Sequence, residues 1–489
     1  MQQVNLGMIG GGTVGSGVFH ALQLNGALMS SRIGVKVNVR KIAVKAFDEP
    51  RPYAIPNSQM TTDWQSVVND PQVDMVAELV GGTTLARTMI LTSLKLGKPV
   101  ITANKALLSA HGEDLFAAAQ QYRTNLYYEA SVCGGIPIIK SLREGFVGNR
   151  ITHLYGIVNG TCNYILTRMK LEGADFASVL KDAQAQGYAE TEPSLDVDGH
   201  DALHKIGILA SLAHGFWVNP KHIHVEGIRD ITALDIRFAE QLGYTIKLLG
   251  IIKSVERRVS RSAAIEAGGP REKGLLYPAL PSKGGEGEGF ATNAGHGLNS
   301  KALASRGSGK GTGARIQVSV YPTLVPNSHV LASVNHVFNA LFVRGDIVGD
   351  TLFYGRGAGK DATASAVLSD LADAALDLKF GTKHRVPPFV PHERAGAVAP
   401  IEEVVSRYFV RLNVVDVPGT LAKIATIFGK AKIGISSVIQ PEGHEGESVP
   451  LILMLHDAPN GAVARALKKI AALPIIKGAP VMVRVEDFQ

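Results

Sequence analysis

The chain of 489 residues has only two cysteines, Cys133 and Cys162, and no apolar run long enough to cross a bilayer. Two cysteines cannot build a disulfide framework or a cysteine metal cluster, and a membrane-spanning helix needs roughly 18 apolar residues. The N-terminus also lacks a basic segment followed by an apolar one, so we expect no secretory signal. These absences favour a globular protein of the reducing cytoplasm, and the length suggests about three domains.

Clustered positive charge is missing as well, although the formal net charge is +7 and the isoelectric point is near 9.2. Proteins that bind nucleic acids usually gather Lys and Arg into a patch or stripe, whereas the basic residues of this chain are scattered. We therefore expect no nucleic-acid partner, and no membrane partner. Binding of anionic small molecules would explain the positive net charge at least as well as binding of nucleic acid.

The start of the chain has the pattern of a dinucleotide-binding turn. An apolar run over 4–9 leads into Gly10-Gly11-Gly12-Thr13-Val14-Gly15, which has the spacing G-x-G-x-x-G, and a helical pattern follows. The first glycine permits the tight turn, the second lets backbone approach a pyrophosphate, and the third lets the helix pack on the strand. Free N–H groups at the helix N-terminus then face the phosphates. The residues expected to bind this cofactor are Gly10, Gly12, Thr13, Val14 and Gly15.

Alternating strand and helix patterns over residues 1–134 predict a dinucleotide-binding α/β domain with a parallel sheet. The expected strands are 4–9, 37–44, 73–80, 98–102 and 125–129, and the expected helices are 14–28, 84–96 and 106–121. Ligands of such sheets bind in the loops at the carboxyl ends of the strands. Thr102 and Lys105 fall in one of these loops and are therefore candidate site residues.

Residues 135–382 have longer helical patterns and fewer strands, which predicts an α+β domain that covers one sheet face with helices. Helices are expected at 135–147, 161–171, 175–186, 198–214, 230–249, 328–343 and 361–376, with strands at 151–158, 247–258 and 314–321. Within this domain, 266–314 is rich in glycine and poor in large apolar residues, which predicts a flexible surface insertion. The proline-rich stretch 383–400 is typical of a linker.

Residues 401–489 have the order strand, helix, strand, strand, helix, strand. The strands are expected at 405–415, 435–440, 449–456 and 480–485, and the helices at 420–431 and 460–472. This βαββαβ order is the ferredoxin-like arrangement.

The most acidic stretch runs from Gly187 to Lys205 and ends on a helix that carries Asp201 and Lys205 four residues apart. One interpretation is a solvated acidic loop with a surface ion pair worth tenths of a kcal/mol. The other is a polar pocket wall, with carboxylates for an ammonium group and a lysine that delivers a proton. His200 and His204 share a helix face, but two histidines alone are weak evidence for zinc.

Six segments, in this order along the chain, resemble the homoserine dehydrogenase family in its long form with a C-terminal ACT regulatory domain. They are residues 10–17, 102–106, 129–137, 159–165, 187–205 and 355–366. The resemblance implies a Rossmann-type first domain and a ferredoxin-like ACT domain at the end. It also implies reversible NAD(P)-linked interconversion of L-homoserine and L-aspartate 4-semialdehyde, a step towards threonine and methionine.

The resemblance assigns roles to individual residues. Lys205 would protonate the developing alkoxide, and Lys105 would hold substrate and cofactor in line. The substrate would contact Glu190, Asp196, Asp201, Gly187 and Thr161, and the cofactor would also contact Lys45, Thr102, Lys105 and Gly359. A structural cation of the sodium type would be bound by Glu129 and the carbonyls of Val132, Gly134 and Ile136. For the oxidative direction, we expect burial or the neighbouring Lys105 to depress the pKa of Lys205.

Two positions depart from the family pattern. Cys133 stands where small, glycine-like residues are usual, and Asp361-Ala362 replaces a proline before Thr363. The second strand ends in Ala43-Val44-Lys45, and this basic ending favours NADP over NAD.

The turn at 416–421 resembles the ACT ligand turn, which implies feedback inhibition by L-threonine and a homodimer or homotetramer. Two alternatives remain open. One is another Rossmann dehydrogenase for amino acids or semialdehydes, and the other is a non-catalytic sensor of NAD(P) and amino acids.

Overall fold

The structure is a computed structural model that describes residues 1–255, 314–382, 385–441, 444 and 446–488. Residues Met1–Val255 and Ala314–Gln489 form one compact unit. All of the expected insertion 266–314 except its last residue lies outside the described residues, and so do two residues of the expected linker. None of the helices in the described ranges combines the length and the apolar character needed to cross a membrane.

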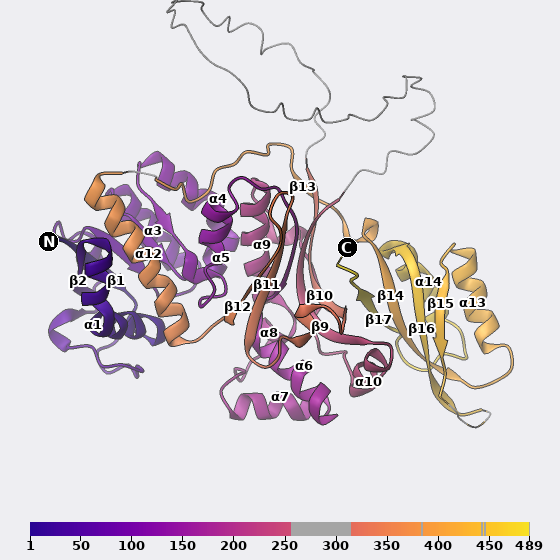
Figure 1. Ribbon diagram of the computed structural model, residues 1–489. Helices are drawn as coiled ribbons and strands as arrows, with labels where there is room; N and C mark the ends of the chain where they lie inside the picture. The colour runs from indigo at the N-terminus through magenta and orange to yellow at the C-terminus, as the bar shows by residue number, and fades with distance from the viewer. Residues whose placement is uncertain (256–313, 383–384, 442–443, 445, 489) are drawn as a thin grey trace, which may run out of the picture. The chain divides into compact units, whose positions relative to one another are not determined.

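The first sheet has six parallel strands in the order β3-β2-β1-β4-β5-β6. Figure 1 shows β1 and β2 of this sheet near the N-terminus of the chain. The strands are β1 Gln2–Ile9, β2 Val35–Ala43, β3 Met60–Thr61, β4 Met75–Glu78, β5 Val100–Thr102 and β6 Leu126–Tyr127. The connecting helices are α1 Thr13–Ile33, α2 Gln65–Val68, α3 Thr84–Lys95 and α4 Lys105–Gln121. The order reverses between β1 and β4, which creates the crevice where ligands of such sheets bind. The predicted parallel Rossmann-like sheet is confirmed.

A helix from much later in the chain completes this core. Helix α12, Lys360–Phe380, packs against α1 and the first sheet through alanine and branched apolar side chains. The two helices approach closely at Gly17, where an added Cβ would lie 3.2 Å from the carbonyl oxygen of Lys360. The segment after residue 357 therefore returns to the crevice beside the glycine-rich turn.

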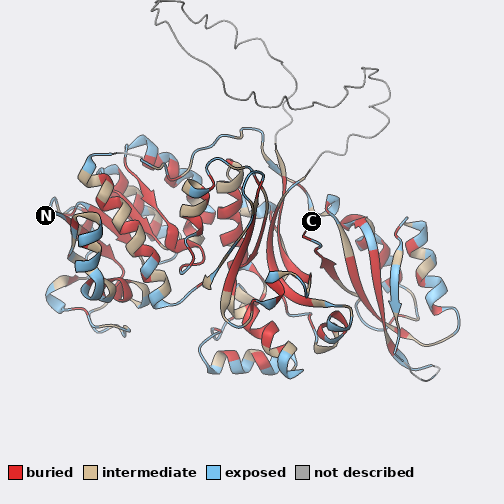
Figure 2. Cartoon of the chain, in the orientation of Figure 1, coloured by how far each residue is buried: buried red, intermediate tan, exposed pale blue. Residues whose placement is uncertain are grey.

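The second sheet is mixed and has the main strand order β12-β11-β7-β9-β10-β17-β14-β16-β15, with β8 and β13 added beside β10. Its strands up to β13 are β7 Ile151–Ile157, β8 His224–Val225, β9 Tyr244–Ser254, β10 Arg315–Pro326, β11 Phe338–Gly345, β12 Gly349–Arg356 and β13 Ala397–Val398. The helices of this part are α5 Ile138–Lys140, α6 Gly160–Glu172, α7 Phe176–Ala185, α8 Ser194–Val197, α9 His200–His214 and α10 Ala233–Gln241. Figure 2 shows that the strands are largely buried, while the helices keep exposed outer faces.

The C-terminal elements are β14 Val405–Val415, α13 Thr420–Lys430, β15 Ile435–Ile439, β16 Ser448–Pro459, α14 Asn460–Ala471 and β17 Val481–Val485. The predicted βαββαβ order is confirmed. These strands join the second sheet because β17 pairs with β10, where Arg484 lies opposite Thr323. The C-terminal elements and the middle of the chain therefore share one continuous sheet.

Two helix predictions were wrong in the middle of the chain. The stretch 328–343 forms a short 3-10 turn and then β11, which pairs with β12, a strand that the sequence reading missed. The stretch 230–249 forms α10 and then the start of β9, with a break at Gly243, whose φ is +85°. Short apolar runs fit a buried strand as well as a helix, and here pairing across the sheet decides the outcome.

Candidate active site

A cavity of about 520 Å³ opens where the turns after the first sheet face α6, α8 and α9. Val14, Ala103 and Lys105 line it from the loops of the first sheet. Its opposite side is lined by Asn159, Gly160, Thr161, Gly187, Tyr188, Asp196, Asp201 and Lys205. The rest of the lining comes from Ala130, Ser131, Cys133, Val337, Asn339, the segment Arg356–Gly359 and Thr363. Several segments that are far apart in sequence thus meet at one cavity.

The two lysines singled out by the sequence share one carboxylate in this cavity. The Lys205 ammonium lies 2.7 Å from Oδ2 of Asp201, and the Lys105 ammonium lies 3.2 Å from Oδ1 of the same residue. Lys205 also donates to the carbonyl oxygen of Val158 at 2.7 Å. Its side chain is buried, whereas that of Lys105 is 34% exposed. The interpretation of Asp201 and Lys205 as a solvated surface pair is therefore wrong.

The charges of this trio depend on each other. Burial alone would lower the pKa of Lys205, but the Asp201 carboxylate raises it above its ordinary value. Against its own burial, the pKa of Asp201 is held well below its usual range by the two ammonium groups. The expectation of a depressed pKa for Lys205 is thus contradicted, because a carboxylate lies between the two cations. Lys205 is a protonated, buried acid at neutral pH.

Asn159 fixes the carboxylates around this trio, and the sequence reading gave it no role. Its Nδ2 donates to Oδ1 of Asp196 at 2.7 Å and to Oδ2 of Asp201 at 2.9 Å. Its Oδ1 accepts from the N–H of Cys162 and so caps α6. The available signal was the Asn-Gly-Thr start of a helix, which is typical of an N-cap. One side chain therefore anchors both the helix and the acidic pocket.

The glycine-rich turn has the backbone geometry that a pyrophosphate requires. Gly10 has φ +109°, and a Cβ added there would lie 2.6 Å from the carbonyl oxygen of Leu79. A Cβ added at Gly15 would lie 1.9 Å from the carbonyl oxygen of Gly10, whereas one at Gly12 would meet no atom within 4 Å. Helix α1 has no side-chain cap and no acidic residue in its first turn. Its N-terminus can therefore take an anion.

Comparison with known proteins agrees with this arrangement. A family model described as homoserine dehydrogenase matches residues 137–268 and 286–372, and one described as homoserine dehydrogenase, NAD binding domain, matches residues 10–129. The homoserine dehydrogenase of Pseudomonas aeruginosa is 37% identical, with 100% of both chains covered. That of Corynebacterium glutamicum is 35% identical, with 99% of this chain and 96% of that one covered. This chain belongs to the homoserine dehydrogenase family.

A solved structure extends the match to three dimensions. The crystal structure of a homoserine dehydrogenase from Thiobacillus denitrificans has a TM-score of 0.84 at 36% identity, and the alignment covers 100% of this chain and 99% of that chain. The chain is accordingly an NAD(P)-dependent oxidoreductase that acts on a CH–OH group.

Several other positions that the sequence linked to homoserine dehydrogenase line the cavity. Thr161 donates its hydroxyl to the carbonyl oxygen of Tyr188 at 2.9 Å, and Gly187 has φ +74°. Gly359 has φ +114° with open space around it, and it directly precedes α12. Asp361 sits in the first turn of that helix and accepts from the hydroxyl of Tyr53, so the missing proline leaves the helix start intact.

Several predicted site residues lie away from the cavity lining, among them Glu190, Lys45 and Thr102. Glu190 is exposed on the loop after α7, and Lys45 is exposed just past the end of β2. The hydroxyl of Thr102 is buried and donates to Oε2 of Glu78 at 2.7 Å. Arg40, near Lys45 in sequence, is already paired with Asp70 at 2.8 Å. Of the two basic side chains Arg40 and Lys45, Lys45 is therefore the one better placed to contact an anionic group near the end of β2.

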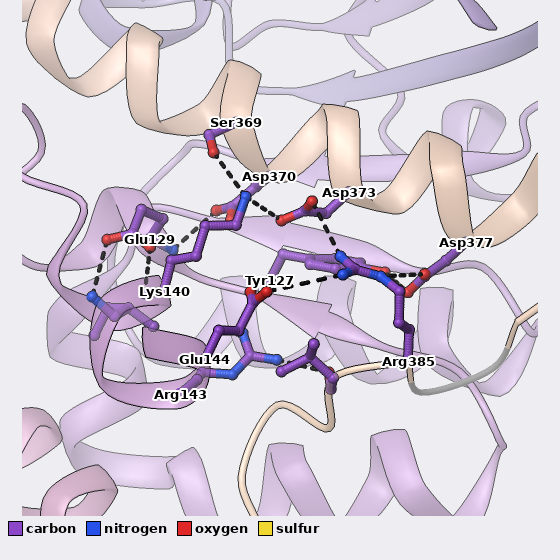
Figure 3. A network of polar contacts seen from close by, with 12 residues as sticks. Tyr127, Glu129, Lys140, Arg143, Glu144, Ser369, Asp370, Asp373, Asp377 and Arg385 are labelled. Carbon is purple, nitrogen blue, oxygen red and sulfur yellow. Dashed lines mark hydrogen bonds and ion pairs between the residues drawn. The ribbon is translucent and has the colours of Figure 1, made fainter. Parts of the chain in front are cut away.

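The loop expected to hold a cation is joined to α12 by a polar network (Figure 3). The Glu129 carboxylate accepts the backbone N–H groups of Ile139 and Lys140 at 2.9 and 2.7 Å, while its own N–H donates to Asp370 at 2.9 Å. Burial raises the pKa of Glu129 to about 7. The Lys140 ammonium lies 2.7 Å from Asp373, so α5 and α12 are held together by an ion pair.

Cys133 lies in the same loop and has φ +50°, a left-handed conformation that favours glycine. Its buried thiol accepts from Nδ2 of Asn339 at 3.4 Å. This left-handed backbone agrees with the glycine-like residue that the family resemblance led us to expect there. Asn339, which also lines the cavity, was missed because the sequence reading placed it in a helix.

Proposed function

We propose that this homoserine dehydrogenase interconverts L-aspartate 4-semialdehyde and L-homoserine, with Lys205 as the proton donor and Lys105 as the residue that aligns the substrate. The contact of both lysines with Asp201 inside one cavity is the observation that carries this proposal. The step would serve the synthesis of threonine and methionine. A non-catalytic sensor would have no need for a buried, protonated lysine in a cavity that the glycine-rich turn also lines.

The chemistry follows from the charges. The bound nicotinamide would supply a hydride to the carbonyl carbon in the reductive direction and accept one from the carbinol carbon in the oxidative direction. As the carbonyl oxygen gains negative charge, the Lys205 ammonium stabilises it and transfers a proton to it. Asp201 keeps Lys205 charged in a buried place, and Asn159 keeps Asp201 from rotating away. In the oxidative direction Lys205 must first lose its proton, which Asp201 opposes.

Substrate recognition is proposed to use the acidic side of the cavity. The α-ammonium group of the substrate would face Asp196 and the loop that carries Glu190, with Thr161 and Gly187 beside it. Burial raises the pKa of Asp196, and a bound ammonium group would favour its ionised form. Glu190 would have to turn towards the cavity when substrate binds, since its side chain is exposed in this structure.

The cofactor is proposed to be NADP, with its pyrophosphate on the turn Gly10–Gly15 and its nicotinamide towards Gly359. The exposed Lys45 supports the choice of NADP over NAD, because a 2′-phosphate needs a basic partner.

We also propose a structural cation of the sodium type at Glu129 and the carbonyls of Val132, Gly134 and Ile136. These donors are all oxygen atoms, and such donors suit a hard cation.

We further propose that residues 1–134 bind the dinucleotide, that 135–382 bind substrate and dimerise, and that a linker at 383–400 leads to an ACT domain at 401–489. Separate family matches on either side of residue 134 support the first boundary. The turn before α13 supports an amino-acid site, because Gly419 has φ +86° and the helix start has no side-chain cap. The expected effector is L-threonine, in a homodimer or homotetramer.

One assay tests this proposal. The purified protein should oxidise NADPH in the presence of L-aspartate 4-semialdehyde, use NADH less efficiently, and lose activity when L-threonine is added. A variant without residues 401–489, if it folds, should be insensitive to threonine. Absence of semialdehyde-dependent NADPH oxidation would contradict the assigned substrate. Threonine insensitivity of the full chain would contradict the regulatory role alone.

A further inference from the structure

An arginine from the C-terminal elements is held in place by contacts with the middle of the chain. Arg484, on β17, has a side chain that is only 2% exposed, and its guanidinium donates to both carboxylate oxygens of Glu226 at 2.8 Å. The same group donates to Oδ1 of Asn460 at 2.8 and 3.1 Å and stacks 4.3 Å from the ring centroid of Tyr321. Such bidentate contacts fix the relative placement of two segments.

Glu226 belongs to a short connection, residues 224–229, that we term the 224–229 strap. The strap residues directly after Glu226 hold α8 through backbone contacts. The N–H of Ile228 donates to the carbonyl oxygen of Val197 at 2.8 Å, and a Cβ added at Gly227 would lie 2.3 Å from that oxygen. No side chain fits between the strap and α8 at this point.

The strap also contacts α8 and the residue after it through the side chain of Arg229. Arg229 donates to Oδ1 of Asp198 at 2.5 Å and to Oγ of Ser194 at 3.0 Å. Arg229 therefore holds Ser194, the first residue of α8, and Asp198, the residue just after the end of α8. Helix α8 has a single turn, so its position depends on these external contacts rather than on its own hydrogen bonds.

Helix α8 carries the cavity residue Asp196, whose carboxylate accepts from Asn159 at 2.7 Å. After α8 the chain turns at Gly199, with φ +86°, and enters α9 with Asp201 and Lys205. A shift of the strap would therefore move Asp196 relative to the lysine pair. Only residues 226–228 separate the C-terminal arginine from the backbone of this pocket wall.

We propose that Arg484 and Glu226 are positioning residues for the reaction, which couple the C-terminal elements to Asp196 and thereby set the affinity for the substrate. This inference rests on the proposed function, because it takes Asp196 as part of the substrate site. The pair gives an effector bound among the C-terminal elements a direct route to the substrate pocket. We expect the Arg484–Glu226 pair to affect substrate binding and not the binding of the cofactor at the glycine-rich turn.

Two variants test the inference in the full-length protein. Glu226→Gln and Arg484→Met should each raise the KM for L-aspartate 4-semialdehyde by at least about fivefold, the lower end of coupling between sites. The KM for NADPH should change by less than twofold, since the strap contacts α8 and none of the contacts described above reaches the turn Gly10–Gly15. The double variant should have a semialdehyde KM no higher than that of the stronger single variant, because each single variant removes the same Arg484–Glu226 interaction.

Arg411→Met is the matched control. Arg411, on β14, pairs with Asp235 at 2.6 Å, and the side chain of Asp235 is 0% exposed where that of Glu226 is 34% exposed. Asp235 belongs to α10, which contributes no residue to the cavity lining. Its loss should lower thermal stability and leave both KM values within twofold of the parent. An equal rise of the semialdehyde KM in all three variants would overturn a specific route through the strap.

Hydrogen exchange supplies a readout that is independent of turnover. Amides of residues 194–199 should exchange at least about fivefold faster in Glu226→Gln and Arg484→Met than in the parent or in Arg411→Met. Unchanged exchange at 194–199 and an unchanged semialdehyde KM in folded Glu226→Gln would overturn the inference. An inactive parent chain would instead contradict the proposed function, and the exchange result would still decide the role of the strap.

Discussion

The two sides of the active-site cavity are built by different means. The turn Gly10–Gly15 reaches the cavity through Val14, and its function depends on backbone geometry and on the absence of side chains at its glycines. The side formed by Asn159, Asp196, Asp201 and Lys205 is made of charged and polar side chains that fix each other. Changes on the backbone side should therefore affect cofactor binding, and changes on the charged side should affect proton transfer and substrate binding.

The largest effect is expected from Lys205→Ala. Loss of the proton donor should lower kcat for semialdehyde reduction by about 10² to 10⁴-fold, the usual range for general acid catalysis. The KM for NADPH should stay within about twofold, which steady-state kinetics can check. Lys170→Ala is the control, because Lys170 pairs with Glu240 and does not line the cavity. Turnover near that of the parent would refute the role of Lys205.

Gly12→Val tests the backbone side of the cavity. Because a Cβ at Gly12 meets no atom within 4 Å, the variant should fold, yet its side chain would occupy the space needed for the pyrophosphate. We expect the KM for NADPH to rise at least tenfold, equivalent to about 1.4 kcal/mol. Gly26→Ala, also in open space on α1, should leave kinetics unchanged and stabilise the helix by about 0.5–1 kcal/mol. An unchanged KM in Gly12→Val would place the cofactor elsewhere.

Asp201→Asn separates charge from shape on the charged side. Without the carboxylate, burial should lower the pKa of Lys205, because nothing then offsets the cost of burying its charge. Semialdehyde reduction needs protonated Lys205, so the alkaline limb of its pH–rate profile should move to lower pH by at least about 1 unit. A limb at the same pH in parent and variant would show that Asp201 does not control this lysine.

The smallest effect is expected from Lys45→Ser. Removing one exposed charge should reduce the preference for NADPH over NADH by up to about tenfold, because a hydrogen bond to a charged phosphate contributes about 1.5 kcal/mol. Lys36→Ser, exposed at the other end of β2, is the control and should not change the ratio. A preference that survives Lys45→Ser would assign the 2′-phosphate contact to another residue.

The backbone side could be predicted from the sequence because its signal is local. Glycine spacing, a preceding strand and a following helix lie within residues 4–28, and the parallel sheet follows from the alternation of elements. The partnership of Lys105 with Asp201 could not be derived from spacing, since it requires two segments nearly 100 residues apart to meet. The resemblance to a family supplied that link, and it did not reveal Asn159 or the raised pKa of Lys205.

The errors in the fold have the same origin. The runs 328–343 and 230–249 contain apolar residues at spacings that suit a helix, but their C-terminal parts belong to β11 and β9 because neighbouring strands offer pairing partners. Their conformation is decided by contacts with distant strands, which no local pattern reveals. The C-terminal βαββαβ order was predictable because its turns are marked by glycine and proline, as at Pro418-Gly419.

The pH dependence of L-homoserine oxidation by the parent protein tests the central claim most directly. If Lys205 must lose its proton, and its pKa lies above the ordinary value because of Asp201, kcat should rise about tenfold per pH unit from pH 6 towards pH 10 without a plateau. Reduction of the semialdehyde should be nearly constant over the same range. A plateau of oxidation between pH 6 and 8 would contradict the account, because it would assign proton transfer to a group such as His204.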